Sequence, residues 1–169
     1  VPVQTERYTD IPTEPHVNES ILLSRLTSDR QEVFQDIAKR LQFIADRDQI
    51  LQDILDSVCH AAEADRAYIA LMDESSVLWV STLFGIDVDR GDQIPGLAQS
   101  WIDAVFESEG PYHMQNLQGT GTVIVCTPIW AGDNLIGILF MNRKKGFSEN
   151  DLDFITIVLE HARIPIQNA

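Results

Sequence analysis

The residues best suited to nucleophilic or metal chemistry are two cysteines and four histidines, and they are scattered along the chain. Cys59 and Cys126 lie among apolar neighbours, whereas the histidines, at positions 16, 60, 113 and 161, belong to unrelated segments. Catalysis and metal binding need several such groups at motif spacing, and the sequence contains no glycine-lysine phosphate loop, zinc-protease helix motif or nucleophile elbow. The pattern predicts a non-catalytic chain with two free, buried thiols and no metal or chromophore.

Charge and cysteine content narrow the classes of partner. The chain has 169 residues, with 12 basic against 26 acidic side chains and a net charge of −14. A surplus of this sign repels nucleic-acid phosphates and anionic lipids, so we expect direct binding neither to nucleic acid nor to a membrane. No apolar run approaches the roughly 18 residues that span a bilayer, and unpaired cysteines favour a cytoplasmic location. The start at Val1 suggests a fragment of a longer protein.

A strongly apolar hairpin is the element around which the chain must pack. Residues 122–130 and 135–142 are apolar runs that flank the turn sequence Ala131–Asn134, and neither run alternates cleanly between apolar and polar. Strands covered on both faces have this pattern, so we expect a central hairpin with a loop of about four residues. Gly137 has no side chain to pack, which indicates close approach by another backbone or a ligand.

The remaining segments complete one predicted domain. Residues 67–72 and 77–84 have the β-branched and aromatic content of a second hairpin, and residues 97–107 have the apolar spacing of a helix. Residues 1–28 are rich in proline and acids and predict a linker or tail with a short apolar segment. The domain itself is expected over residues 29–169.

Helices at both ends of this domain carry apolar stripes. The first helix and the last helix each place three large apolar residues on one side, and we expect a homodimer through these stripes, which are Val33, Ile37, Leu41, Leu152, Ile155 and Leu159. Ser148 with Asp151 predicts a capping box that opens the last helix. Pro165 predicts a kink or helix end near Arg163 and Ile164.

The central hairpin and the segment after it resemble the GAF domain, a sensory fold of signalling proteins. The resembling residues are Thr127-Pro128-Ile129, Leu135-Ile136-Gly137-Ile138-Leu139, Asn142, Phe147 and Asp151. The resemblance extends over residues 30–168. It implies an α+β, profilin-like fold, in which an antiparallel sheet carries the N- and C-terminal helices on one face and a pocket-side helix and loops on the other.

Two local motifs are similar to motifs of particular GAF groups. Asn142, Phe147 and Asp151 resemble a motif of cyclic-nucleotide GAF domains, in which a cation at the strand end, here Arg143 or Lys144, pairs with the acid and fixes strand against helix. The Cys59-His60 pair resembles the pair by which some bilin-binding members hold a chromophore, but it lies too early in the domain. A packed thiol beside a surface histidine is expected instead.

The resemblance also implies where a ligand would bind. GAF domains bind on the sheet face away from the terminal helices, and four side chains are our candidates for a cavity there: Trp79, Trp101, His113 and Cys126. Each is larger or more polar than a helix-packed sheet face requires. The alternative is that the tryptophans fill this space as core.

These observations leave three functions to compare. The first is a non-catalytic sensory or regulatory domain of a signal-transduction or transcription-regulatory protein, which binds a small molecule or partner and relays its state through the terminal helices. The second is a dimerisation or interaction module with a vestigial pocket. The third is a reductase of free methionine sulfoxide, a class of GAF proteins that uses several cysteines near the pocket, which Cys126 alone does not reproduce.

Overall fold

The computed structural model describes residues 18–85, 113–117 and 122–169. The described helices are α2 (Glu19–Arg25), α3 (Ser28–Leu41), α4 (Arg47–Ala62) and α6 (Glu149–Asn168). The described strands are β1 (Arg66–Met72), β2 (Leu78–Phe84), β3 (His113–Leu117), β4 (Thr122–Ala131) and β5 (Asn134–Arg143). Among these helices none is long and apolar enough to cross a membrane. The helix predicted over residues 97–107 lies outside the described residues.

The strands form one antiparallel sheet in the order β2-β1-β5-β4-β3. β4 and β5 are the predicted hairpin, but the four-residue loop was wrong, because Ala131 and Asn134 still pair and only Gly132 and Asp133 lie between them. Gly132 has φ +59°, a conformation that glycine adopts without strain in such tight turns. At Gly137 a Cβ would overlap the carbonyl oxygen of Ala70, so the predicted close approach is by the neighbouring strand β1.

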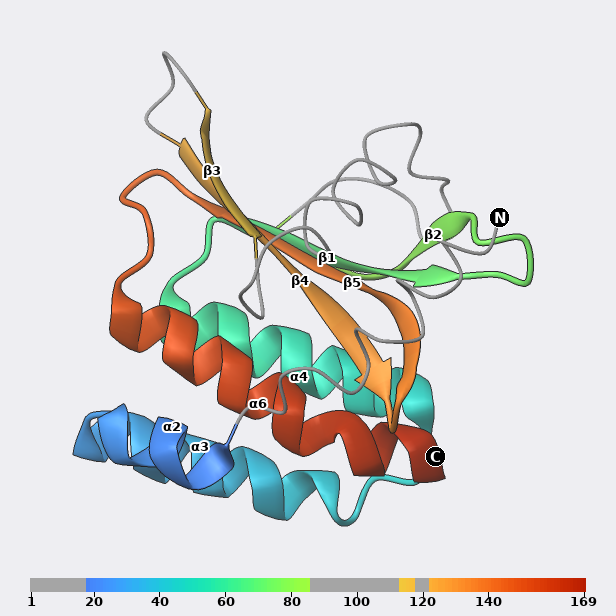
Figure 1. Cartoon of the computed structure of the whole chain (residues 1–169), viewed down its shortest axis with the longest axis horizontal. Helices are drawn as coiled ribbons and strands as arrows, with labels where there is room; N and C mark the ends of the chain where they lie inside the picture. Colours follow the sequence, from blue (N-terminus) through green and yellow to red (C-terminus); the bar gives the residue numbers. More distant parts are fainter. Residues whose placement is uncertain (1–17, 86–112, 118–121) are drawn as a thin grey trace.

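Helices cover one face of this sheet in two layers (Figure 1). α4 and α6 pack directly on the sheet, and α2 and α3 pack on the other side of α6 and α4. The core between sheet and helices contains Phe154 from α6, Ile54 from α4 and Leu139 from β5, all fully buried. The predicted α+β fold with the terminal helices on one face is confirmed.

Capping residues explain where the helices begin. Ser148 accepts a hydrogen bond from the backbone of Asp151 and the Asp151 carboxylate accepts one from the backbone of Ser148, which confirms the predicted capping box of α6. Of the predicted kink or helix end near Arg163 and Ile164, the helix end was wrong, because α6 continues through Pro165 to Asn168. Its last turn is held in place by full burial of Ile166 and by the Gly132 N–H, which donates to the Arg163 carbonyl at 3.0 Å.

The two apolar stripes predicted as a dimer surface are used within the chain. Ile37, Leu41, Leu152, Ile155 and Leu159 are all buried, because α3 covers α6. Val33 alone of the six remains accessible, with 39% of its surface exposed. Five of the six stripe residues therefore belong to the chain's own core, and the homodimer stays a prediction.

Candidate functional site

A second apolar cluster lies on the sheet face turned away from α4 and α6, which we call the far face. Side chains alternate along a strand, and Ala67 and Ile69 of β1 point into the helix-side core, so Tyr68 and Ala70 point to the far face. The cluster has eight members, the first five buried and the last three partly buried: Ala70, Leu78, Ile124, Cys126, Ile138, Tyr68, Met72 and Phe140. A sheet that needed only to bury its helix-packed face would not require this second cluster.

Tyr68 and Phe140 form an aromatic pair at the centre of the far face. They are opposite each other in the β1–β5 register, and their rings stack at 4.7 Å between centroids with 11° between planes. Burial, and then the neighbouring Cys126, raises the pKa of the Tyr68 phenol to about 12. The phenol therefore keeps its proton at neutral pH and offers one O–H donor beside an apolar surface.

The two thiols lie on opposite sides of the sheet. Cys126 belongs to the far face, whereas Cys59 of α4 belongs to the helix-side core, so the two are free and cannot reach each other. Burial raises the pKa of each thiol to about 12, and for Cys59 the nearby Asp56 adds to this. A thiol is a nucleophile or metal ligand only as the thiolate, so neither cysteine is set up for such chemistry.

Asp151 joins three elements at the other end of the fold. Arg143 at the end of β5 approaches its carboxylate at 3.6 Å, which confirms the predicted brace of strand against helix and assigns it to Arg143. Arg30 of α3 makes a shorter contact with the same carboxylate, at 2.6 Å, and also donates to the Ala61 carbonyl at the end of α4. Because Asp151 is buried, these contacts position helices and strand and leave no room for a ligand.

A depression of about 390 Å³ lies elsewhere, on the surface of α3. Its lining residues come from one helix and are mostly charged or polar: Glu32, Val33, Gln35, Asp36 and Lys39. We do not place a ligand there, because binding sites enclose a ligand between elements and are predominantly apolar. Within the described residues no group of three or more histidine, cysteine or acidic side chains could hold a metal ion.

Comparison with known proteins places this arrangement in a family. A family model described as "GAF domain" matches residues 46–166, which is more than half of the chain. The chain belongs to the GAF domain family. No curated protein sequence matches it significantly.

Solved GAF domains share the fold at low sequence identity. The GAF domain of an Acinetobacter phosphoenolpyruvate-protein phosphotransferase is 16% identical, with a TM-score of 0.67 over 83% of this chain and 94% of that one. The phycoerythrobilin-bound GAF domain of a cyanobacterial phytochrome is 13% identical, with a TM-score of 0.68 over 85% of this chain and 97% of that one. The GAF domain of a two-component sensor histidine kinase from Bacillus halodurans is 20% identical, with a TM-score of 0.55 over 70% of this chain and 94% of that one.

In this GAF domain the predicted pocket residues are only partly brought together. His113 of β3 is opposite Cys126 of β4 in the register, so their backbones are adjacent, but the structure describes no position for the His113 side chain. Trp101 lies outside the described residues. Cys126 is therefore the one predicted side chain that can be assigned to the far face.

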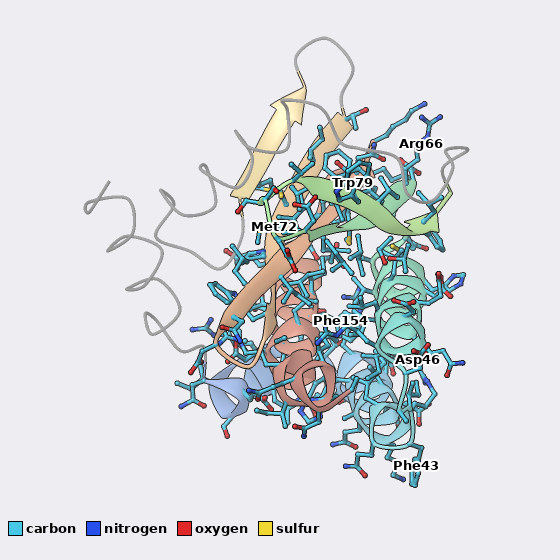
Figure 2. All side chains as sticks on the ribbon, turned by 90° about the vertical axis from the view of Figure 1, so that its right-hand side faces the viewer. Phe43, Asp46, Arg66, Met72, Trp79 and Phe154 are labelled. Atoms are coloured by element: carbon cyan, nitrogen blue, oxygen red, sulfur yellow. The ribbon has the colours of Figure 1, made fainter. Side chains whose placement is uncertain are left out.

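Trp79 faces the other side of the sheet. It pairs with Leu71, which packs against the helix-side core, and 40% of the surface of Trp79 remains exposed. Its Nε1 donates to the Asp73 carboxylate at 2.9 Å, and this bond is the main cause that lowers the pKa of Asp73. Figure 2 shows Trp79 on the β1–β2 hairpin, well away from Phe154 of α6. The structure thus does not place Trp79 beside Cys126.

Tyr68 and Phe140 are the far-face residues that the sequence reasoning did not select. In both strands, successive residues belong alternately to the helix-side core and to the far-face cluster. The order Ala67, Tyr68, Ile69 could have indicated this position, because side chains alternate along a strand and a tyrosine between two small or aliphatic core residues must point to the opposite face. Reading it needed the pairing of β1 with β5, which joins residues more than seventy positions apart.

Proposed function

We propose that this GAF domain is a non-catalytic sensory and regulatory domain of a larger, cytoplasmic signal-transduction or transcription-regulatory protein. On this proposal it binds a small molecule at the far face and relays its state through the terminal helices. The observation that carries the proposal is the separate far-face cluster with its Tyr68–Phe140 pair and protonated Cys126. Related folds in a phytochrome, a sensor histidine kinase and a chemotaxis protein support a signalling role.

Contacts between β4 and α6 support the relay. Strand β4 carries Cys126 on the far face, and the turn after it reaches α6, where Gly132 donates to the Arg163 carbonyl at 3.0 Å. The Arg163 guanidinium also lies 5.2 Å from the centre of the Trp130 ring, a cation–π distance. A shift of β4 caused by a ligand would therefore reach the last turns of α6 directly.

A thermal-shift screen of metabolites and nucleotides tests the proposal. A far-face ligand at a hundredfold excess over its dissociation constant should stabilise the fold by about 2.7 kcal/mol and raise the melting temperature. Phe140→Leu should remove that shift, because it removes half of the aromatic pair. Phe43→Leu is the matched control, because Phe43 is 86% exposed on the helical side of the molecule. A screen that moves no melting curve, or a shift that Phe140→Leu leaves intact, would contradict ligand binding at the far face.

The alternative function is an interaction module with a vestigial pocket. It is favoured by Phe43, whose exposure has no explanation within the fold, and by the partly exposed Val33 on α3. With the predicted stripes buried, this outer surface would be the contact between copies or with a partner. Light scattering on the wild type and on Phe43→Ser tests it: a dimer that becomes a monomer in the variant supports the module, and a monomeric wild type at high concentration excludes the homodimer.

A further inference from the structure

We propose that the outer face of α3 binds the same face of a second copy of this chain, in an antiparallel contact with two-fold symmetry. In this contact Phe43 of each copy enters the depression on α3 of the other copy, and Lys39 pairs with the partner's Asp36. The inference rests on the interaction-module function, to which it assigns a surface and a partner. It does not require a ligand at the far face.

The side of α3 that faces away from the fold carries one row of exposed residues. Phe34, Ile37 and Leu41 are buried and hold the opposite side of the helix against α4 and α6. The N–H of Phe43 donates to the Arg40 carbonyl at 3.0 Å, so the helical turn continues just past Leu41. Residues spaced four, three and four apart lie in one row along a helix. The row consists of Glu32, Asp36, Lys39 and Phe43, all of them exposed.

This row offers an exposed aromatic side chain and a depression that can receive one. Phe43 is 86% exposed, and Figure 2 shows it at the outer end of the helical side, beyond Asp46 and far from Phe154. The depression of about 390 Å³ lies toward the start of α3 and includes the apolar side chain of Val33. At 1.5 Å per residue, Phe43 and Val33 are roughly 15 Å apart along the helix. A two-fold axis midway between them brings each Phe43 to the partner's depression, as a self-complementary contact requires.

The charges in the row match the same axis. With the axis between residues 37 and 38, Asp36 stands opposite the partner's Lys39, and Glu32 stands opposite the partner's Phe43. None of these three charged side chains forms an ion pair within the described part of the chain. A parallel pairing would instead set Asp36 against Asp36 and Lys39 against Lys39, and like charges repel. The antiparallel contact therefore satisfies the ring and the charges together.

A second copy fits this face better than an unrelated partner does, because the face is self-complementary in both shape and charge. The net charge of −14 opposes association of two copies at long range, so the attraction must come from the local contacts. One helix from each copy buries less than about 1,200 Å² in total, the size of weak and transient complexes. We therefore expect a reversible dimer whose population rises with protein concentration.

Charge reversal tests the antiparallel register. Sedimentation velocity over a concentration series should show a monomer–dimer equilibrium for the wild type. Lys39→Glu should weaken the dimer about tenfold to a hundredfold, because acids then face each other at two places. Asp36→Lys should weaken it similarly, although this variant lowers the net charge and so reduces the long-range repulsion. An equimolar mixture of the two variants should restore the dimer, because the two acids of one copy then face the two lysines of the other.

Two further variants complete the test. Phe43→Ser should weaken the dimer at least about tenfold, because it removes both of the inserted rings. Lys145→Glu is the matched control: it makes the same substitution in the turn after β5, which Figure 1 shows at the opposite end of the molecule from the end of α3. This control should leave the dimer unchanged, since Lys145 is exposed and lies outside the proposed contact.

Three outcomes would overturn the inference. The first is a wild type that stays monomeric at about 1 mM, which would leave the face to a different protein. The second is a mixture of the two charge variants that associates no better than either variant alone. The third is a dimer that Phe43→Ser leaves intact or that Lys145→Glu weakens as much as Lys39→Glu does. None of these outcomes affects the sensory function, which the ligand screen decides.

Discussion

Asp151 shows how one buried carboxylate can determine the positions of several elements. It closes the capping box at the start of α6, meets Arg143 from β5 and meets Arg30 from α3. A buried charge is tolerated only when partners replace its lost hydration, and two guanidiniums with a backbone N–H supply that replacement. The arrangement is thus a structural junction that fixes where β5 ends and where α6 begins.

Replacing Asp151 by asparagine should destabilise the domain strongly. The variant removes the charge between two largely buried arginines and leaves their guanidiniums without a counter-ion, at a cost of about 3 kcal/mol in the free energy of unfolding. Urea unfolding at neutral pH measures it. Asp53→Asn is the control, because the Arg40–Asp53 pair is more exposed and should be worth less than about 1 kcal/mol. Equal effects of the two substitutions would show that Asp151 is not the junction described.

At the scale of elements, contacts between residues close in sequence could be predicted, whereas contacts between distant segments could not. The capping box at Ser148 and the brace at Arg143 depend on neighbours a few positions apart, and both were predicted. The side of the sheet on which Trp79 lies was not predicted, because a bulge between Ile69 and Ala70 shifts the β1–β2 register by one residue. Uninterrupted pairing would have set Trp79 opposite Met72 on the far face, whereas the bulge sets it opposite Leu71 and turns it toward the helix side.

The outer helical layer was equally beyond sequence reasoning. Arg30 and Asp151 are 121 positions apart, so nothing local indicated that α3 is tied to α6. The apolar stripe of α3 was visible, but a stripe does not show whether it covers its own chain or another copy. Only the packing of Ile37 and Leu41 against the chain's own core decides between these alternatives.

The α2–α3 layer should open separately from the rest of the fold when Arg30 is replaced. Among the described residues, the polar contacts between α2 and α6 are long, with Asn150 donating to the Arg25 carbonyl at 3.4 Å and His161 at 3.4 Å from Glu19. The short, buried contact of this layer with α6 is the one that Arg30 of α3 makes with Asp151. Arg30→Gln leaves Asp151 paired with Arg143. Amide hydrogen exchange over residues 19–41 should therefore accelerate about tenfold to a hundredfold, from the loss of about 1.5–3 kcal/mol, while the sheet stays protected.

Arg40→Gln is the matched control for this layer. Arg40 also lies on α3, but its pair with Asp53 is more exposed, so exchange over residues 19–41 should change little. If Arg30→Gln accelerates exchange in β1 and β5 as much as in α3, the layer does not open on its own and Arg30 acts through global stability instead.

The whole molecule buries one thiol on each side of its sheet, which links its stability to pH. Cys59 lies in the helix-side core and Cys126 in the far-face cluster, with Tyr68 beside it. Each group is buried in its neutral form, and burial disfavours the charged form. Ionisation of these groups at high pH therefore destabilises both the helix-side core and the far-face cluster, rather than a single local site.

The free energy of unfolding should decrease as the pH rises above about 9, because these three groups have higher pKa values in the folded state than in the unfolded state. The thiol pKa values rise from 9.0 in a solvated reference to about 12 in the fold, and that of Tyr68 rises from 10.0 to about 12. The folded state therefore holds these protons more tightly than the unfolded state, so their contribution is complete below pH 9 and is lost progressively between pH 9 and 12. Urea midpoints measured from pH 7.5 to 10.5 should decline, and less steeply in the Cys59→Ala, Cys126→Ala double variant, because two of the three groups are then missing. A double variant that declines as steeply as the wild type would show that the thiols are not the groups responsible.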